Sequence, residues 1–291
     1  MMKYKPMLAQ PVGDYSRITK KEWNDGLYIQ PKLDGVRCVI QSECRGSSWV
    51  VKAYSRTGKE WKNIQHILAE LKPFFAEHPN VILDGELYNH ELKNDFEKII
   101  SLVRKTKPNL EDRLESKDMV RFHCYDTIMK HMDFASRNHF IKKHFGWNKF
   151  PSVVTLPYAV AYNTEEVEVQ HDLQKAAGYE GSILRKNAPY ECKRSWTLME
   201  IKDFSDAEAT IIGFEEGKGK RAGHLGKFIM RDDEGVEFGC PPGKGYNYKD
   251  MKNLLFRAPH YIGARATFTY FERTKKGSYR HPLFKSIRDY E

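Results

Sequence analysis

The stretch Gln30-Pro31-Lys32-Leu33-Asp34-Gly35-Val36-Arg37 lies between two short apolar runs, at 27–29 and 36–40. The length and composition of these runs predict strands, and Asp34-Gly35 is typical of the turn between two strands. Lys32 then lies at the end of a strand. A lysine in such a place becomes a nucleophile when burial or nearby cations keep its amine neutral. On these residues alone, an ordinary surface hairpin is the better explanation.

Strands and helices alternate over the first two-thirds of the chain. Apolar residues recur at helical spacing between 64 and 75, which predicts a helix. A second predicted helix runs from Asn163 or Thr164 to Gly178. After residues 203–207 the strands follow one another closely, with one short helix near 250–256, which is typical of a Greek-key barrel of the OB type. We therefore expect an α+β chain of two domains, 1–205 and 206–291. The predicted strands are 27–29, 36–40, 50–54, 81–83, 120–125, 182–184, 198–201, 209–214, 227–231, 236–238, 262–271 and 284–287.

Composition limits the class of protein and its partners. The 291 residues carry 48 Lys and Arg against 39 Asp and Glu, for a net charge of +9. A basic surface attracts polyanions such as nucleic acid, without specifying which one. No apolar run is long enough for a membrane span or signal peptide, and the five scattered cysteines form no C-x-x-C pair. We expect a soluble cytoplasmic protein, in the host cytoplasm if a phage encodes it, with no membrane partner.

Five further segments place charged or aromatic residues at predicted strand ends. Each segment alone fits a turn, a solvated arginine or a core aromatic residue. Together they supply a nucleophilic lysine, carboxylates for Mg²⁺, cations for phosphate and an aromatic ring, which are the groups that nucleotidyl transfer needs. The segments are Ser55-Arg56-Thr57-Gly58, Asp84-Gly85-Glu86, Phe122-His123-Cys124-Tyr125-Asp126, Glu180-Gly181-Ser182 and Glu200-Ile201-Lys202.

In this order and at these spacings, the segments resemble the motifs of ATP-dependent DNA ligases, in the lysine-adenylating nucleotidyltransferase superfamily. The resemblance covers nearly the whole chain. It implies an ATP-grasp-like nucleotidyltransferase (adenylation) domain followed by an OB-fold β-barrel. It also implies ATP and Mg²⁺ as cofactors, with Mn²⁺ as a substitute, and a monomer that seals nicks in duplex DNA.

The resemblance also implies residue roles. Lys32 is the site of covalent AMP, and Glu86 and Glu180 hold the metal ion. Tyr125 is the favoured ring for stacking on adenine, with Phe122 in reserve. The implied ATP- and AMP-binding residues are Gln30, Lys32, Leu33, Arg37, Arg56, Glu86, Phe122, Tyr125, Arg185 and Lys202. The implied DNA-binding residues are Lys218, Lys220, Arg221, Arg280, Lys285 and Arg288.

Three features depart from the family pattern. Gln30 replaces the usual glutamate that reads the adenine amino group, and we expect its amide oxygen to accept the same hydrogen bond. Glu200 replaces a common lysine, so that Lys202, with Arg185 or Lys186, must neutralise the phosphates. The sixth motif, Arg-x-Asp-Lys, is absent near the C-terminus.

Four other functions resemble this pattern less closely. An RNA ligase usually has Asn in place of Asp34, and a GTP-using mRNA capping guanylyltransferase normally carries the sixth motif. NAD-dependent ligases need more than the 31 residues that precede Lys32, together with a tetracysteine zinc site. A non-enzymatic binding protein would require the whole motif set to be coincidental.

Overall fold

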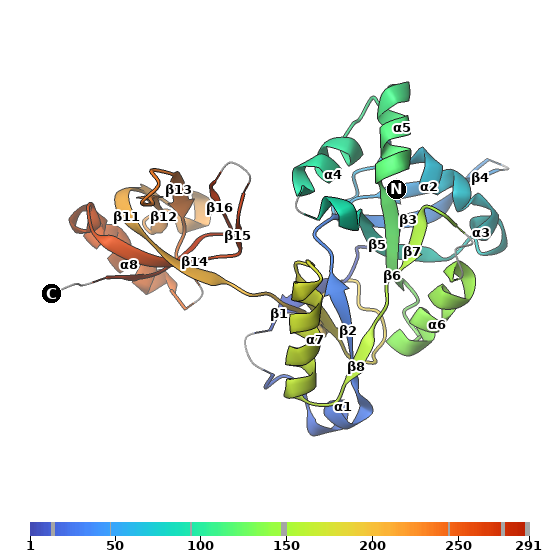
Figure 1. Cartoon of the computed structure of the whole chain (residues 1–291), viewed down its shortest axis with the longest axis horizontal. Helices are drawn as coiled ribbons and strands as arrows, with labels where there is room; N and C mark the ends of the chain where they lie inside the picture. The colour runs from blue at the N-terminus through green and yellow to red at the C-terminus, as the bar shows by residue number, and fades with distance from the viewer. Residues whose placement is uncertain are drawn as a thin grey trace. The chain divides into compact units, whose positions relative to one another are not determined.

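The chain folds into two compact units, Met1–Ile201 and Lys202–Glu291, each described here by itself (Figure 1). The structure is a computed structural model that describes residues 1–12, 15–46, 48–93, 95–146, 150–243, 245–274 and 277–288. No helix among these residues is both long enough and apolar enough to cross a lipid bilayer.

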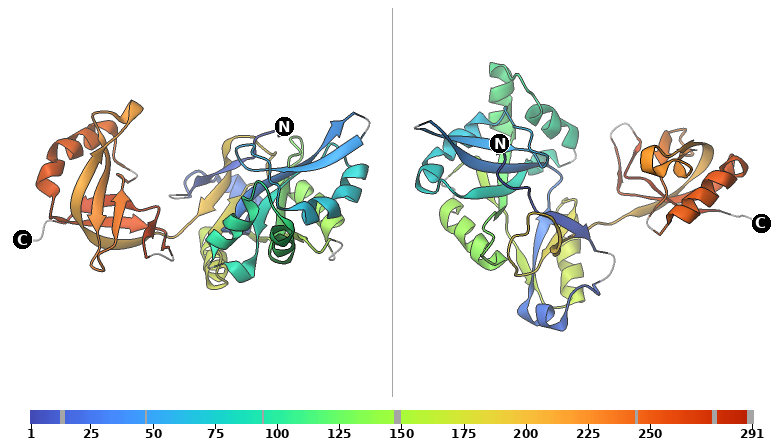
Figure 2. Two further views of the ribbon diagram at one scale, coloured as in Figure 1. Left: turned by 90° about the horizontal axis from the view of Figure 1, so that it is seen from above. Right: turned by 180° about the vertical axis from the view of Figure 1, so that it is seen from behind.

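Two five-stranded sheets form the frame of the first unit (Figures 1 and 2). Sheet A has the order β1-β10-β9-β2-β8, and sheet B has the order β4-β3-β5-β6-β7. The strands of sheet A are β1 (Leu8–Pro11), β2 (Leu27–Lys32), β8 (Ala159–Ala161), β9 (Gly181–Arg185) and β10 (Arg194–Ile201). Those of sheet B are β3 (Val36–Arg45), β4 (Ser48–Tyr54), β5 (Ile82–Tyr88), β6 (Arg121–Thr127) and β7 (Val153–Thr155).

The segment between Lys32 and Val36 crosses from sheet A to sheet B, because β2 belongs to one sheet and β3 to the other. Gly35 allows this crossing. A Cβ at this position would lie 2.6 Å from the Leu87 carbonyl oxygen and 2.7 Å from Cγ of Glu86. Only glycine permits so close an approach of backbone to backbone. The predicted hairpin is therefore a link between two sheets, and Lys32 lies where they meet.

Proline, an N-cap residue and glycine set the ends of helices in the first unit at two places. The predicted helix over 64–75 is two helices that meet at Leu71, where Pro73 fits the first turn of the second but could not continue the first. The predicted helix after Asn163 begins with that residue as N-cap and ends just before Gly178, whose φ is 88°. The helices are α1 (Lys20–Asp25), α2 (Gln65–Glu70), α3 (Lys72–Glu77), η1 (His90–Leu92), α4 (Phe96–Val103), α5 (Leu110–Met119), α6 (Phe134–Phe145) and α7 (Thr164–Ala176).

The largest hydrophobic core packs α2, α3, α4 and α6 against sheet B. Ile64, Phe75, Leu83 and Phe122 are almost completely buried in it. Each such side chain contributes roughly 1.5–3 kcal/mol by leaving water. This core fixes the positions of β3, β5 and β6, which carry the polar residues described below.

His123 on β6 is a largely buried titratable group in this unit. Its Nδ1 atom has no hydrogen-bond partner, and its ring lies 5.3 Å from that of Tyr88, centroid to centroid. Burial, with His90 and Arg121 adding to it, lowers the pKa of His123 to about 4. Between pH 4 and about 6.5 the unfolded chain therefore binds more protons at this residue than the folded chain does.

We expect His123→Phe to reduce the loss of stability in acid. Because the folded-state pKa is the lower one, the wild type should lose about 2 kcal/mol of unfolding free energy at this site between pH 7 and pH 5. The variant lacks the titrating ring and should not show that part of the loss. Urea unfolding of both proteins at the two pH values measures the difference. Equal losses of unfolding free energy in the two proteins would contradict the lowered pKa of His123.

The second unit contains a five-stranded antiparallel sheet in the order β13-β12-β11-β14-β17. Phe228, Phe268 and Phe284 are fully buried in its core. The strands are β11 (Ser205–Glu216), β12 (Leu225–Arg231), β13 (Glu237–Cys240), β14 (Arg265–Tyr270) and β17 (Leu283–Ile287). The unit also contains η2 (Gly219–Arg221), α8 (Tyr248–Arg257), η3 (Ala258–Tyr261) and the strand pair β15 (Glu272–Arg273) and β16 (Tyr279–Arg280).

The sheet has the strand content expected of an OB-type fold, but it does not close into a barrel over the described residues. The edge strands β13 and β17 meet through a single bridge, between Pro242 and Phe284. Pro241 and Pro242 directly follow β13. Proline has no N–H to donate, so it cannot extend a ladder of hydrogen bonds. The expected barrel is therefore a curled sheet that is open on one side.

Candidate active site

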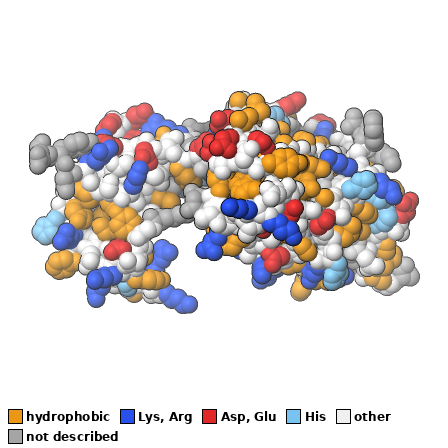
Figure 3. Space-filling model, turned by 90° about the horizontal axis from the view of Figure 1, so that it is seen from below, with side chains coloured by type: hydrophobic (Ala, Val, Ile, Leu, Met, Phe, Trp, Pro, Cys, Tyr) orange, Lys and Arg blue, Asp and Glu red, His pale blue; other side chains and the backbone are white. Residues whose placement is uncertain are grey.

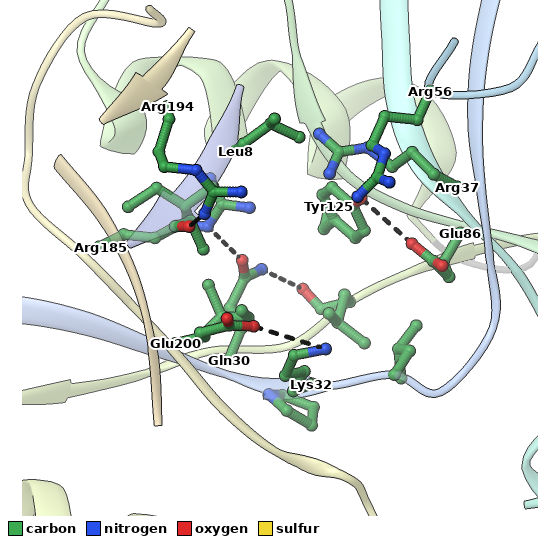
Figure 4. A pocket seen from close by; sticks show the side chains of 16 residues that line it. Leu8, Gln30, Lys32, Arg37, Arg56, Glu86, Tyr125, Arg185, Arg194 and Glu200 are labelled. Atoms are coloured by element: carbon green, nitrogen blue, oxygen red, sulfur yellow. Dashed lines mark hydrogen bonds and ion pairs between the residues drawn. The ribbon is translucent and has the colours of Figure 1, made fainter. Parts of the chain in front are cut away.

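A cavity of ≈ 240 Å³ in the first unit is lined by residues from both sheets (Figure 4). Eight of the predicted nucleotide-binding residues line it. These are Gln30, Lys32, Leu33, Arg37, Arg56, Glu86, Tyr125 and Arg185. The remaining lining residues are Leu8, Ala9, Pro31, Leu156, Ile183, Arg194, Leu198 and Glu200.

Lys32 ends β2 at the wall of this cavity. Its Nζ lies 2.5 Å from Oε2 of Glu180 and 3.9 Å from Oε2 of Glu200. Burial acts to lower the pKa of Lys32, but the Glu180 carboxylate, helped by Glu200 and Glu86, outweighs burial and raises it. The lysine therefore rests as an ammonium ion. Glu180 is the acceptor in place to take its proton when the amine reacts.

Arg37 is the second residue of β3 and is held by a buried carboxylate. Its Nε and Nη2 atoms donate to the two oxygens of Asp84, at 2.7 and 2.5 Å, and the Tyr190 hydroxyl donates to the same carboxylate at 2.6 Å. Burial opposes the charge of Arg37, but Asp84 overcomes it and raises the arginine pKa. A two-pronged ion pair of this kind fixes the direction of the guanidinium as well as its charge. Arg37 thus presents a permanent, immobile cation to the cavity.

Tyr125 enters the cavity because of a β-bulge in β6. Asp84 pairs with Asp126, and the next residue of β5, Gly85, pairs with Cys124, so that Tyr125 is the extra residue. Its ring lies 5.2 Å from the Arg37 guanidinium carbon, and its hydroxyl donates to Glu86 at 3.3 Å. Phe122, the reserve candidate, is fully buried in the hydrophobic core. Tyr125 is thus the one of these two rings that a ligand in the cavity can contact.

Glu86 and Glu180 supply carboxylate oxygens beside Lys32. Burial, partly opposed by Arg37 and Lys32, raises the pKa of Glu86 to about 7. No group of three or more His, Cys, Asp or Glu side chains in the described ranges is arranged to hold a metal ion alone. Mg²⁺ is commonly held by one or two carboxylates together with water and substrate phosphate oxygens. The residues present therefore fit a Mg²⁺ ion that is shared with a nucleotide.

The amide oxygen of Gln30 on β2 has a hydrogen-bond partner within the protein. That oxygen accepts a hydrogen bond from Nε of Arg185 at 2.7 Å (Figure 4). Arg185 in turn donates to Asp126 at 2.8 Å, and Asp126 also receives two hydrogen bonds from Arg137. The expected acceptor for an adenine amino group is thus already engaged within the protein.

Lys202 and the six predicted DNA-binding residues belong to the second unit. Lys202 is the first residue of the second unit, and its Nζ lies 5.0 Å from the centroid of the Phe271 ring. The loop cations are exposed at and beside η2, and Arg280 lies 5.7 Å from the same Phe271 ring. Two others already have partners within their own unit: Lys285 pairs with Asp206 at 2.6 Å, and Arg288 pairs with Glu208 at 2.8 Å.

Several residues of the site had not been predicted. Arg194 lines the cavity, Asp84 with Tyr190 holds Arg37 in place, and Asp126 with Arg137 holds Arg185 in place. Arg194 comes to the cavity through the parallel pairing of β10 with β1, where it is the partner of Leu8. A local sequence pattern cannot predict the pairing of two strands that lie so far apart in the chain. Glu200 had been noted only as a departure from a motif.

The fold and the cavity, with a lysine among carboxylates and fixed arginines between two sheets, define a nucleotidyltransferase. A family model described as ATP dependent DNA ligase domain matches residues 6–202, and one described as DNA ligase OB-like domain matches residues 216–288. The first match covers more than half of the chain. The protein belongs to the ATP-dependent DNA ligase family.

Individual relatives agree with this assignment. The chain is 25% identical over 262 residues to a DNA ligase of Haemophilus influenzae, covering 89% of this chain and 86% of that one. It is 28% identical over 229 residues to a DNA ligase of African swine fever virus, covering 76% of this chain but only 52% of the viral one.

Solved structures show the same fold. A Lig E DNA ligase, described as binding DNA with a minimal scaffold, matches with a TM-score of 0.76 and 25% identity, over 99% of this chain and 100% of that one. The ATP-dependent DNA ligase of bacteriophage T7 in complex with ATP matches with a TM-score of 0.56 and 18% identity, over 98% and 99% of the two chains. The second likeness concerns the fold alone.

Proposed function

We propose that this protein seals nicks between a 5′-phosphate and a 3′-hydroxyl in duplex DNA, through a lysyl-AMP and a DNA-adenylate. The observation that carries the proposal is Lys32 at the wall of the cavity, 2.5 Å from Glu180, in a cavity that Glu86 and the fixed Arg37 also line. Residues 1–205 then act as the adenylation domain and residues 206–291 as the OB domain. The protein acts as a monomer.

In the proposed first step, Glu180 takes one proton from the resting Lys32 ammonium at its nearby Oε2, and the neutral Nζ then attacks the α-phosphate of ATP. The N–P bond forms as the P–O bond to pyrophosphate breaks, and the second amine proton leaves to the departing pyrophosphate or to water. The charge that develops on the phosphate oxygens is stabilised by Arg37, Arg56 and Arg194 in the cavity wall. Mg²⁺, held by Glu86 and Glu180 when bound, would neutralise phosphate charge and polarise the α-phosphate. Lys202 remains a predicted contact of that phosphate.

In the later steps, AMP passes to the 5′-phosphate of a nick, and the 3′-hydroxyl then displaces it. A second cavity of ≈ 580 Å³ supports a place for the 5′-phosphate strand. It shares Arg37, Arg56 and Glu86 with the first cavity and adds the cationic side chains of Lys59 and Arg104. A phosphate held there would lie beside the lysyl-AMP. Cations of this kind bind the DNA backbone without reading its sequence.

The metal proposal predicts a change in the requirement for Mg²⁺. Glu86→Gln and Glu180→Gln should each raise the Mg²⁺ concentration for half-maximal adenylation by about tenfold or more, because each removes a charged ligand. Glu60→Gln, a change at an exposed carboxylate that pairs with Lys52, is the control. Binding of Mn²⁺, followed by loss of its free-ion EPR signal, gives a second readout that does not depend on activity. Unchanged Mn²⁺ binding in both cavity variants would contradict these metal roles.

The exposed cations around η2 are the proposed loop contacts with DNA. Lys218→Ala combined with Lys220→Ala and Arg221→Ala should weaken the binding of nicked duplex DNA. The negative slope of log K against log salt concentration should become shallower, by about 0.9 for each phosphate that is no longer neutralised. Adenylation by ATP should change less than twofold. The matched control removes the exposed cations Lys249, Lys252 and Arg257 on α8, with equal loss of charge. Equal salt slopes in the two triple variants would refute the loop's role.

Two assays separate the proposed function from its alternatives. Labelled ATP and GTP, offered with Mg²⁺, should give an acid-stable adduct from ATP only, whereas a capping guanylyltransferase would react with GTP. Nicked DNA and nicked RNA duplexes should then be sealed at different rates, with DNA much faster. Faster sealing of RNA would point to an RNA ligase.

We also propose that the protein works in the cytoplasm, or in the host cytoplasm if a phage encodes it. All five cysteines are free thiols, and three of them are buried. Free thiols of this kind are typical of proteins in a reducing compartment. On the face shown in Figure 3, Lys and Arg side chains are interspersed with Asp and Glu side chains.

A further inference from the structure

The side-chain amide of Gln30 has a fixed orientation in the cavity wall. Gln30 is 1% exposed, and its Oε1 lies 2.7 Å from Nε of Arg185. A guanidinium group can only donate hydrogen bonds, so the amide atom facing it must be the oxygen. The amide nitrogen then lies on the other side, toward the backbone carbonyl oxygen of Leu156.

Arg185 cannot readily turn away from Gln30. It is 4% exposed, and its Nη1 donates to Asp126, which is completely buried. Arg137 donates to the same carboxylate through Nε and Nη2, at 2.7 and 3.1 Å. Moving Arg185 would break a buried ion pair, which is far more costly than turning an amide in solvent. The chain from Arg137 through Asp126 and Arg185 therefore holds the Gln30 amide in one orientation.

Among the described residues, the amide nitrogen of Gln30 has only a poor hydrogen-bond partner. Its distance to the Leu156 carbonyl oxygen is 3.5 Å, at the outer limit for a hydrogen bond. Gln30, Leu156 and Tyr125 all line the cavity. The wall thus presents a hydrogen-bond donor beside an acceptor. A ligand with an acceptor beside a donor could form a good hydrogen bond with each of these two groups, which form only a weak one with each other.

We infer that Gln30 reads the Watson–Crick edge of adenine by donating from Nε2 to N1, while the Leu156 carbonyl accepts from the 6-amino group. Arg185 is the positioning residue that keeps the donor facing the base. This inference rests on the proposed adenylation by ATP. Guanine in the same place would set its N1–H against the Gln30 N–H and its O6 against the Leu156 carbonyl. Both contacts are repulsive, so the arrangement favours ATP over GTP.

The inference is tested with 1-deaza-ATP, which keeps the amino group but has C–H in place of N1. For the wild type, the KM in the adenylation reaction should be roughly tenfold or more higher with 1-deaza-ATP than with ATP, because a buried donor loses its partner. Gln30→Glu has the same shape but no donor, so the two KM values should become nearly equal. Arg185→Met frees the amide to turn and should bring the ratio of KM values toward one, with a smaller effect on kcat.

Each outcome has a separate meaning. If the wild type uses both nucleotides equally, or if Gln30→Glu keeps the wild-type ratio, the reading of N1 by Gln30 is wrong. If Arg185→Met folds and keeps the ratio, Arg185 does not position the amide. If Arg185→Met does not fold, Arg185→Lys, which retains the charge beside Asp126, is used in its place. The same ratio of KM values for 1-deaza-ATP and ATP is then measured. Failure of the wild type to form any adduct with ATP would instead refute the proposed function itself.

Discussion

Lys32→Ala should form no covalent adduct with labelled ATP, and its nick sealing from ATP should fall by about 10⁴-fold or more, because the bond-forming atom is removed. Lys32→Arg should fail as well, since a guanidinium stays protonated at all working pH values and cannot attack phosphorus. Binding of nicked duplex should remain within a few-fold of wild type. Adduct formation is measured by gel autoradiography and DNA binding by fluorescence anisotropy.

Lys52→Ala is the matched control for this experiment. Lys52 lies on β4 in the same unit, and its Nζ pairs with Glu60 at 2.9 Å rather than lining the cavity. This variant should form the adduct at close to the wild-type rate. Label retained on the Lys32→Ala protein would place the nucleophile elsewhere and overturn the proposed mechanism.

Asp126→Asn should be among the most destabilising single changes at the site. The Asp126 carboxylate compensates two buried arginines, Arg137 at 1% and Arg185 at 4% exposed, and nothing else of opposite charge is in direct contact with them among the described residues. The amide would leave both guanidinium groups without a counter-ion. Removing one partner of a buried ion pair costs on the order of 3–5 kcal/mol. Urea unfolding followed by tryptophan fluorescence measures this loss.

An exposed ion pair supplies the control for Asp126→Asn. Arg231 and Glu237 pair at 2.6 Å in the second unit, and each side chain is 52% exposed. Glu237→Gln should cost less than about 1 kcal/mol, because water screens such a pair and solvates the remaining charge. Comparable losses for the two substitutions would mean that the buried carboxylate does not stabilise the fold as described.

The order of the sequence motifs predicted half of the residues in the cavity wall. Lys32, Arg37, Glu86 and Tyr125 lie at predicted strand ends, and pairing of those strands brings them together. Residues that reach the site through long-range pairing could not be predicted in this way. Arg194 is an example, because its place depends on the pairing of β10 with β1.

Local patterns failed where tertiary contacts override them. No helix is predicted from the sequence at α6, where the buried Arg137 and Asn138 interrupt the apolar repeat. The buried arginine is tolerated in this helix because Asp126 compensates its charge, which the local sequence does not report. The amide of Gln30 is a second case: the residue type allowed either atom to face the base, and only Arg185 decides between them.

The most direct test of the central claim is a chase of the isolated adenylated protein with nicked duplex DNA in the absence of free ATP. The protein is first labelled with ATP, freed of nucleotide, and mapped by mass spectrometry to place AMP on Lys32. We expect the label to leave the protein, to appear on the 5′-phosphate of the nick and to be released as AMP as the strand is sealed. Label that stays on the protein, or that is released without sealing, would contradict it.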